Sequence, residues 1–300
     1  MKKILILSGN KSTNASFLGI DLENTKTTIA SFQELNYVAK ENKYTLMINK
    51  AAIKDFDVVY FRVVGKFREH AAIISYYCKN RKIPLQDPCF IQDGLVQVPI
   101  FKGLETLLMA DNNIPIPKTG FVTLNFLINF TTKNFEFPCV IKDTESMQAK
   151  EVYLVENESD LEKLHKKLKE KSGKSSWHKK YLVQEFVNAS HRHRIFVLGD
   201  EILAGIIRPM KWYDKIYLKD NCERKKISSA LNPIPEDEKK LSLEAAVAAR
   251  LNIAGVDLIV DDKTGKKYIM EVNYEPQWEA LAKDNSINVE KNILKYLASL

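Results

Sequence analysis

The chain has 300 residues, of which 45% are hydrophobic and 28% are charged, and its formal net charge is +7. This length allows two domains or one elaborate domain, and the composition is that of an ordinary globular protein rather than a disordered or fibrous one. The four cysteines are scattered and form no CxxC pair, which excludes a zinc ribbon and a disulfide framework and favours the reducing cytoplasm.

The first 95 residues alternate strand-like and helix-like segments. Residues 3–7 (KILIL) are expected to form the first buried strand, because this apolar run is too short for a signal peptide or a membrane span. Residues 28–42 have the apolar spacing of a helix. Further strands are expected at 44–48, 56–63 and 83–85, and a second helix at 68–81. This β-α-β-β-α-β order predicts a small α/β layer with a largely parallel sheet. A single glycine follows the first strand, so no dinucleotide site is predicted.

A linker with prolines near both ends, residues 87–99, separates this region from the rest of the chain. A helix is predicted at 100–113, and the prolines of IPIP at 114–117 end it. Further strands are expected at 137–142, 151–156, 180–187, 193–199 and 201–208, and helices at 235–252 and 288–300. The pair Gly199-Asp200 suits a two-residue hairpin turn between the last two of these strands.

Much of the excess positive charge lies at 161–180 and 223–228. We interpret the first segment as an amphipathic helix with a solvated basic face. The alternative is attraction of an acidic substrate or of nucleotide phosphates. Because no zinc-finger, RNP or helix-turn-helix pattern accompanies the charge, a nucleic-acid partner is not expected.

The residues that indicate chemistry are concentrated in a predicted hairpin formed by residues 255–262 and 266–273. Glu271 and Asn273 are two apart in a strand, so their side chains point to the same face. Asp257 on the other strand can lie opposite them. Either the strand emerges at a wet edge, or these oxygen atoms hold a hard cation such as Mg²⁺ that leaves positions for phosphate oxygens.

In their order along the chain, these residues and the cations before them resemble the ATP-grasp superfamily, most closely its RimK-like carboxylate–amine ligases. The most similar segment is AGVDLIVDDKTGKKYIMEVN, which looks like the metal-binding hairpin of that family. The resemblance implies an α/β (α+β) architecture: an ATP-grasp domain at 98–300, with a lid subdomain at about 118–184. It also implies a small Rossmann-like pre-ATP-grasp domain at 1–97.

The resemblance assigns roles to individual residues. It implies that Mg²⁺, or alternatively Mn²⁺, is held by Asp257, Glu271 and Asn273. It implies that ATP is bound by Lys102, Lys142, Gln184, Glu185, Phe186 and Val187. It implies that Arg194 and Arg208 act on the transferred phosphate and the acyl phosphate, because a planar guanidinium fits phosphate oxygens bidentately.

The chain departs from the family pattern in three places. The lid loop at 143–152 contains no glycine, so Lys150 is expected to supply charge where relatives use backbone N–H groups to bind ATP. Arg192 or His193 stands where relatives carry an acid that holds the ribose. The segment NYEPQWEAL replaces the NxSPG turn of RimK-like members, and Trp278 in it is expected to pack beside an unassigned acceptor site.

The implied reaction forms an amide in two steps. A substrate carboxylate attacks the γ-phosphorus of ATP to give an acyl phosphate and ADP, and an amine then displaces phosphate. The expected partners are small-molecule or peptide carboxylates and amines, including acidic ones, and homo-oligomers are compatible with the sequence. A peptide macrocyclase or ester-forming ligase of the same superfamily is an alternative. A non-catalytic nucleotide-binding protein is an alternative of another class.

Overall fold

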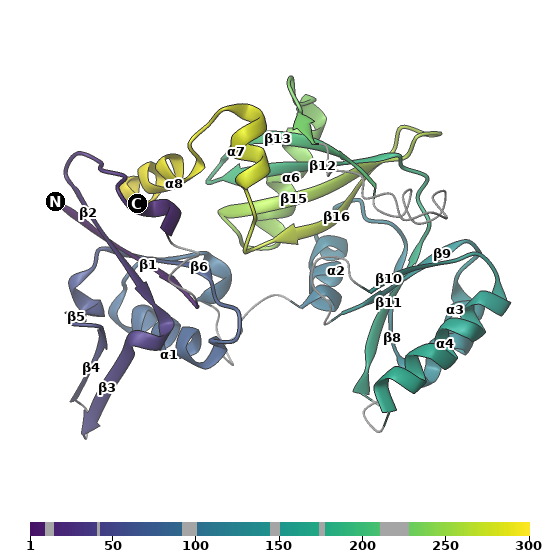
Figure 1. Cartoon of the computed structure of the whole chain (residues 1–300), viewed down its shortest axis with the longest axis horizontal. Helices are drawn as coiled ribbons and strands as arrows, with labels where there is room; N and C mark the ends of the chain where they lie inside the picture. The colour runs from purple at the N-terminus through teal and green to yellow at the C-terminus, as the bar shows by residue number, and fades with distance from the viewer. Residues whose placement is uncertain (10–14, 41–42, 92–100, 145–150, 174–177, 211–227) are drawn as a thin grey trace.

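The computed structural model describes residues 1–9, 15–40, 43–91, 101–144, 151–173, 178–210 and 228–300. Figure 1 shows three α/β layers side by side, with the N-terminal sheet at one end, a central antiparallel sheet, and a third sheet at the other end. None of the helices in these ranges is both long enough and apolar enough to cross a membrane.

The N-terminal sheet is parallel, with strand order β2-β1-β6-β7. Its strands are β1 (Lys2–Ser8), β2 (Thr25–Ser31), β6 (Val58–Val63) and β7 (Leu85–Gln86). In β1, Ile4 and Ile6 join one hydrophobic cluster while Leu5 and Leu7 join another, so both faces of the strand are buried. This is why β1 reads as a continuous apolar run rather than an alternating one. The predicted helix at 68–81 is confirmed as α1 (Arg68–Arg81).

The predicted helix at 28–42 is wrong. Its residues form the end of β2, a short 3₁₀ turn (Phe32–Glu34) and β3 (Leu35–Lys40). A capping box closes the turn: the Gln33 N–H donates to Ser31 Oγ at 3.2 Å, and the Ser31 N–H donates to a Glu34 carboxylate oxygen at 3.1 Å. β3 then pairs antiparallel with β4 (Lys43–Ile48), which also pairs with the short β5 (Ala51–Ala52). Ladder partners elsewhere in the chain therefore override the local helical spacing.

The central sheet is antiparallel, with strand order β14-β13-β12-β15-β16. Its strands are β12 (His191–Leu198), β13 (Glu201–Pro209), β14 (Ser229–Ala230), β15 (Ile253–Val260) and β16 (Lys267–Asn273). The predicted turn between β12 and β13 is confirmed, and Gly199 adopts the positive φ of 66° that such a turn requires.

Helices cover both faces of the central sheet. On one face, Ala245 of α6 (Glu236–Ala248) shares a hydrophobic cluster with Val256 and Leu258 of β15. On the other face, Leu281 of α7 (Glu279–Asn285) and residues of α8 (Val289–Ser299) share a cluster with strand residues that include Phe196. One face of the sheet therefore packs on α6, and the opposite face packs on α7 and α8.

The third sheet has strand order β10-β9-β11-β8 and is also antiparallel. Its strands are β8 (Thr119–Thr123), β9 (Cys139–Asp143), β10 (Val152–Val155) and β11 (Lys180–Glu185), and the helices α3 (Leu127–Asn134) and α4 (Glu158–Ser172) lie against it (Figure 1). α4 buries Leu161, Leu164 and Leu168 and leaves most of its lysines exposed, as expected for a solvated basic face. α2 (Lys102–Asp111) lies between this sheet and the central one in Figure 1.

The N-terminal and central sheets share a hydrophobic core. One cluster contains Leu5 and Leu7 of β1 together with Ala245 of α6 and Val256 of β15. The domain boundary expected near residue 97 lies outside the described residues.

Candidate active site

One face of the central sheet changes from apolar to charged along its strands. On β12 and β13, Phe196 and Ile206 are buried in the cluster that contains Leu281 of α7. Residues of the same parity further along, among them Arg192, Arg194 and Arg208, are charged. The sheet therefore presents a charged patch beside an apolar core, on the face opposite α6.

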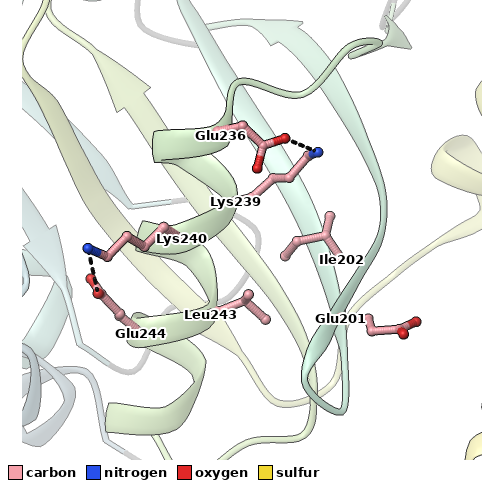
Figure 2. Close-up of a pocket in the computed structure, with 7 residues that line it drawn as sticks. All are labelled: Glu201, Ile202, Glu236, Lys239, Lys240, Leu243 and Glu244. Atoms are coloured by element: carbon pink, nitrogen blue, oxygen red, sulfur yellow. Dashed lines mark hydrogen bonds and ion pairs between the residues drawn. The ribbon is translucent and has the colours of Figure 1, made fainter.

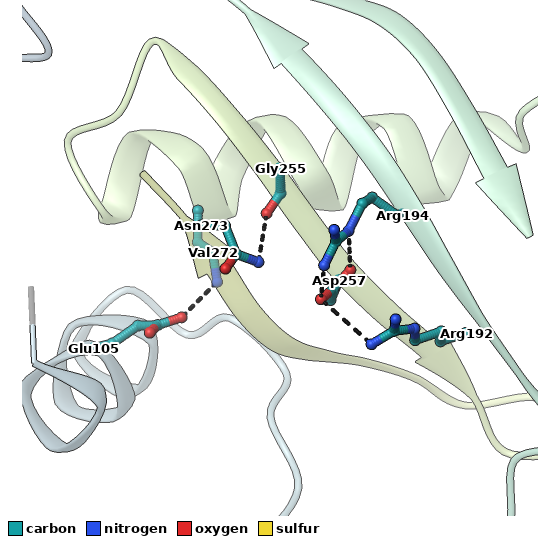
Figure 3. Close-up of polar contacts among 7 residues, drawn as sticks. All are labelled: Glu105, Arg192, Arg194, Gly255, Asp257, Val272 and Asn273. Carbon is teal, nitrogen blue, oxygen red and sulfur yellow. Dashed lines mark hydrogen bonds and ion pairs between the residues drawn. The ribbon is translucent and has the colours of Figure 1, made fainter. Parts of the chain in front are cut away.

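Two carboxylates lie directly opposite each other in this patch. Asp257 of β15 is in register with Glu271 of β16, and Gly255 is in register with Asn273. The Asn273 side-chain amide donates to the Gly255 carbonyl oxygen at 3.3 Å (Figure 3). Burial raises the pKa of Glu271, and the negative charge of Asp257 raises it further. A cation near both carboxylates would relieve this repulsion, so the donor set fits a hard metal ion.

Arg194 forms a two-pronged ion pair with Asp257. Its Nε donates to Asp257 Oδ1 and its Nη2 donates to Oδ2, each at 2.7 Å, while Nη1 of Arg192 lies 3.9 Å from Oδ2 (Figure 3). Burial by itself would raise the pKa of Asp257, but the guanidinium of Arg194 outweighs it and holds that pKa below its ordinary value. The sequence placed Arg194 on a phosphate and Asp257 on a metal, and did not indicate that they bind each other.

Arg208 completes a group of three arginines on this face. It is in register with Arg192 across the β12–β13 ladder. Burial lowers the pKa of Arg208, and the positive charges of Arg194 and Arg192 lower it further. The structure therefore brings both predicted catalytic arginines to the predicted metal ligands, together with a third arginine.

Two lysines approach the patch from other elements. Lys142 is the next-to-last residue of β9, and Lys102 is the first residue of α2. Burial lowers the pKa of Lys142 to about 8, against the effect of Glu271, which raises it. Lys142 Nζ donates to Gln184 Oε1 at 2.5 Å, and Gln184 Nε2 donates to Thr119 Oγ1 at 2.8 Å. The side chain of Gln184 thus orients Lys142.

The other residues expected to bind ATP, 184–187, lie at the end of β11 and directly after it. Glu185 Oε1 accepts the Lys118 N–H at 2.8 Å, so this side chain ties β11 to the start of β8. Val187 follows Phe186 and is buried in a small apolar cluster with Met210 and Ile259. This cluster borders the charged patch on β15, because Ile259 lies two residues from Asp257. Lys150, the lysine expected to bind ATP in the lid loop, lies outside the described residues.

Glu105 belongs to the same site but was not predicted. One of its carboxylate oxygens accepts the backbone N–H of Val272, between Glu271 and Asn273, at 2.5 Å (Figure 3). Burial raises the pKa of Glu105 to about 8, with a further rise from the charge of Glu271. The sequence did carry a signal, because Glu105 lies four residues before Met109 on the buried face of α2.

Trp278 lies in the core rather than at an open surface. It is 3% exposed and contacts Phe17 and Phe196 edge to face, at ring-centroid distances of 6.1 and 5.9 Å. Its indole N–H donates to a Glu290 carboxylate oxygen at 2.8 Å. The guanidinium of Arg62 stacks on its other ring surface, 3.7 Å from the ring centroid. Trp278 thus joins the segment after β16 to the N-terminal sheet.

A surface pocket of about 520 Å³ lies away from this site, between α6 and the β12–β13 turn (Figure 2). It is lined by Glu201, Ile202, Glu236, Lys239, Lys240, Leu243 and Glu244. Both lysines pair with glutamates of the same helix, Lys239 with Glu236 and Lys240 with Glu244. The pocket is on the α6 side of the sheet, so it is not part of the charged patch.

Comparison with known proteins relates the chain to ATP-grasp ligases. The model of the RimK-like ATP-grasp domain matches residues 101–297. A probable alpha-L-glutamate ligase of Mannheimia succiniciproducens is 27% identical over 212 residues, which cover 70% of this chain and 67% of that protein. The alpha-aminoadipate–LysW ligase LysX of Saccharolobus solfataricus is 30% identical over 201 residues, covering 66% of this chain and 69% of that protein.

Solved structures show the same fold. The ATP-grasp ligase PsnB in complex with a minimal precursor superposes with a TM-score of 0.72 at 14% identity, covering 100% of this chain and 99% of that one. D-alanine–D-alanine ligase of Bacillus anthracis in complex with ATP superposes with a TM-score of 0.68 at 17% identity, covering 100% and 97%. At these identities the comparison supports the ATP-grasp fold and carries no information on substrate.

Proposed function

The chain belongs to the RimK-like ATP-grasp family of carboxylate–amine ligases, and we propose that it forms an amide through an acyl phosphate, releasing ADP and phosphate. The observation that carries this proposal is the charged patch of the central sheet. There, Asp257 and Glu271 lie opposite each other beside Arg194, and the charges of Lys102 and Lys142 act on Glu271. Such a patch has the cations and oxygen ligands that phosphoryl transfer needs.

We propose that Asp257, Glu271 and Asn273 would hold Mg²⁺, which would supply positive charge to offset the phosphates of ATP. Related structures support this proposal, since one PsnB complex contains Mg and ADP. With its amide nitrogen donating to Gly255, Asn273 has Oδ1 as its metal-binding atom. Glu105 holds the backbone between Glu271 and Asn273 and so fixes the strand that carries both. Mn²⁺ is the alternative metal.

The remaining residues are proposed to orient the substrates. Lys102 and Lys142 hold phosphates, and Gln184 keeps Lys142 extended toward them. The backbone from Glu185 to Val187 pairs with adenine, whose ring packs on the apolar cluster around Val187. Arg194 and Arg208 stabilise the charge of the transferred phosphoryl group. For Arg194 this requires that it release at least one oxygen of Asp257 when metal and nucleotide bind.

The proposal extends to the class of substrate, the domains and the cellular location. The relatives named above act on amino acids or amino-acid-like groups, which supports an amino acid or a peptide as one substrate. The pre-ATP-grasp domain at 1–97 and the lid subdomain at about 118–184 are proposed to close around these substrates. Buried cysteine thiols among the described residues, at Cys78, Cys89 and Cys139, support a cytoplasmic place of action.

Trapping with hydroxylamine tests the reaction. The protein is incubated with Mg-ATP, hydroxylamine and a panel of amino acids and short acidic peptides. We expect a hydroxamate to form in step with ADP, because hydroxylamine attacks an acyl phosphate as an amine would. Formation of AMP and pyrophosphate would indicate an adenylate and contradict the proposal. Binding of Mg-ATP with no ADP released for any acid in the panel would favour the non-catalytic alternative.

A further inference from the structure

Arg192 and Arg208 form an unusual pair. They lie directly opposite each other on β12 and β13, with both side chains on the face that carries the charged patch. Like charges at directly opposed positions of an antiparallel ladder repel each other and destabilise the sheet. Arg194, two residues along on the same face, adds a third positive charge.

Among the described residues, the acids near this pair do not neutralise it. Asp257 gives both of its oxygens to Arg194 and lies 3.9 Å from Arg192. Asp284 is the other acid whose charge acts on Arg208, and one of its oxygens accepts the Ser228 hydroxyl at 2.5 Å. Within the described part of the chain, Nε of Arg192 and Nε of Arg208 are both buried without a hydrogen-bond partner. A buried Nε–H donor without a hydrogen-bond partner is costly, and here two of them belong to neighbouring guanidinium groups of like charge, so a bound anion would compensate both.

The pair lies away from the two lysines that are proposed to hold the nucleotide phosphates. Lys102 and Lys142 act on Glu271 of β16, at one edge of the sheet. Arg208 lies on β13, and the order β13-β12-β15-β16 puts it three strand spacings away, about 14 Å. An anionic group bound there would lie away from the two lysines, next to the transferred phosphoryl group that Arg208 is proposed to stabilise.

We propose that Arg192, together with Arg208, binds a substrate carboxylate that does not react, and that Arg192 thereby sets the specificity of the enzyme. This inference rests on the proposed function. The ligand is a carboxylate in either of two compounds: the second carboxylate of a dicarboxylic acid substrate, or the α-carboxylate of an amino acid that supplies the amine. The geometry requires that the carboxylate lie over the β12–β13 pair on the charged face of the sheet, within reach of both guanidinium groups.

Isothermal titration in saturating Mg-ADP tests this site with defined probes. Glutarate represents the dicarboxylic acid, L-alanine represents the amino acid, and butyrate and L-alaninamide are their matched controls without the carboxylate in question. We expect glutarate or L-alanine to bind and its control to bind much more weakly. Glutarate binding identifies the acid substrate as the source, and L-alanine binding identifies the amine substrate.

Variants then assign the binding to Arg192. Arg192→Gln should weaken the responding probe about tenfold or more, as expected for loss of a charge-assisted hydrogen bond, and leave the affinity for Mg-ADP unchanged. Arg192→Lys keeps the charge and should lose less. Arg250→Gln removes an exposed arginine just beyond α6 and should leave every titration as in the wild type.

Three results would overturn the inference. Neither probe binds more tightly than its control, or the responding probe binds Arg192→Gln as it binds the wild type. In the third, Arg192→Gln loses affinity for Mg-ADP, which would place Arg192 on the nucleotide. Failure of the wild type to bind Mg-ADP at all would instead reject the proposed function on which this inference depends.

Discussion

Asp257 is buried and Glu271 is partly buried on the adjacent strand, and the two carboxylates lie in different electrostatic environments. Arg194 neutralises Asp257 with two short hydrogen bonds, whereas Glu271 has a raised pKa because of its burial and the nearby charge of Asp257. Burying like charges side by side costs free energy unless a partner compensates. The site is therefore built at the expense of stability, which is common for residues that act on a ligand.

Glu271→Gln tests the metal role. The substitution keeps the shape of the side chain and removes its charge. We expect a loss of ligase turnover of about a hundredfold or more, since a bound metal supplies several kcal/mol of charge stabilisation. We also expect the melting temperature to stay the same or rise, because repulsion from Asp257 disappears. Turnover is measured by ADP release in the hydroxamate assay and folding by thermal unfolding.

Glu279→Gln is the matched control, because Glu279 is an exposed glutamate at the start of α7. It should change neither turnover nor melting temperature. A folded Glu271→Gln protein with near-normal turnover would show that Glu271 is not a metal ligand.

At the scale of single residues, the sequence predicted which way side chains point but not which side chains they contact. The period of two placed Glu271 and Asn273 on one face of a strand without any knowledge of the fold. The pairing of Arg194 with Asp257 depends on which strand lies beside β15, and that neighbour, β12, is more than fifty residues away in the chain. No local pattern specifies such a contact.

At the scale of elements, the segment 28–42 shows the limit of periodicity. Its apolar spacing fits a helix, yet β2 pairs with β1 in parallel and β3 pairs with β4. Short amphipathic segments satisfy either period, and the available ladder partners then decide. The segment 68–81 has no such partner and has helix-compatible composition, so there the prediction holds.

Gly120 of β8 is an element-scale test of the third sheet. A Cβ atom at this position would lie 2.6 Å from two ring atoms of Phe130 on α3 and 3.2 Å from the ring of Phe135. We expect Gly120→Ala to lower the free energy of unfolding by about 1–3 kcal/mol, as overpacking of a core commonly does. Urea unfolding of the purified protein measures the change.

Phe130→Leu provides the control, because a smaller side chain there makes room for the added methyl group. The double variant Gly120→Ala/Phe130→Leu should be more stable than the sum of the two single changes predicts. If Gly120→Ala unfolds at the same urea concentration as the wild type, Phe130 of α3 does not pack against β8 as closely as the structure indicates.

At the scale of the whole molecule, polar contacts between distant segments join the N-terminal sheet to the ATP-grasp region. Glu275, just after β16, accepts the N–H groups of Val64 and Gly65 at 2.6 and 3.3 Å. These contacts lie at the carboxyl end of β6, and the first strand β1 has its neighbours β2 and β6 on opposite sides. Ligands of open α/β sheets commonly bind at such a switch point. The junction therefore ties the hairpin that is proposed to bind metal to the carboxyl end of β6 in the N-terminal sheet.

Asp87 makes a second junction contact, and its stability contribution should depend on pH. Its Oδ1 accepts the N–H groups of Asn252 and Ile253 at 2.8 and 2.9 Å, and its Oδ2 is buried without a hydrogen-bond partner among the described residues. Burial raises the pKa of Asp87 from 3.8 to about 7, against these two hydrogen bonds. Between these values the native state keeps a proton that the unfolded chain has lost. Asp87 therefore costs increasing stability as pH rises from about 4 to about 7, and the cost is constant above that.

Asp87→Asn removes this titration and keeps an oxygen that can accept both N–H groups. The free energy of unfolding of the variant, minus that of the wild type, should grow with pH by up to about 1.4 kcal/mol per unit inside the window and level off above it. Urea unfolding at about pH 5 and about pH 8 measures the difference, and Asp55→Asn, at an exposed aspartate, controls for the loss of one acid. Because all other groups titrate alike in both proteins, only Asp87 changes the difference. An equal difference at the two pH values would mean that Asp87 is ionised throughout, and that the junction between the N-terminal sheet and the ATP-grasp region holds a buried charge rather than a buried proton.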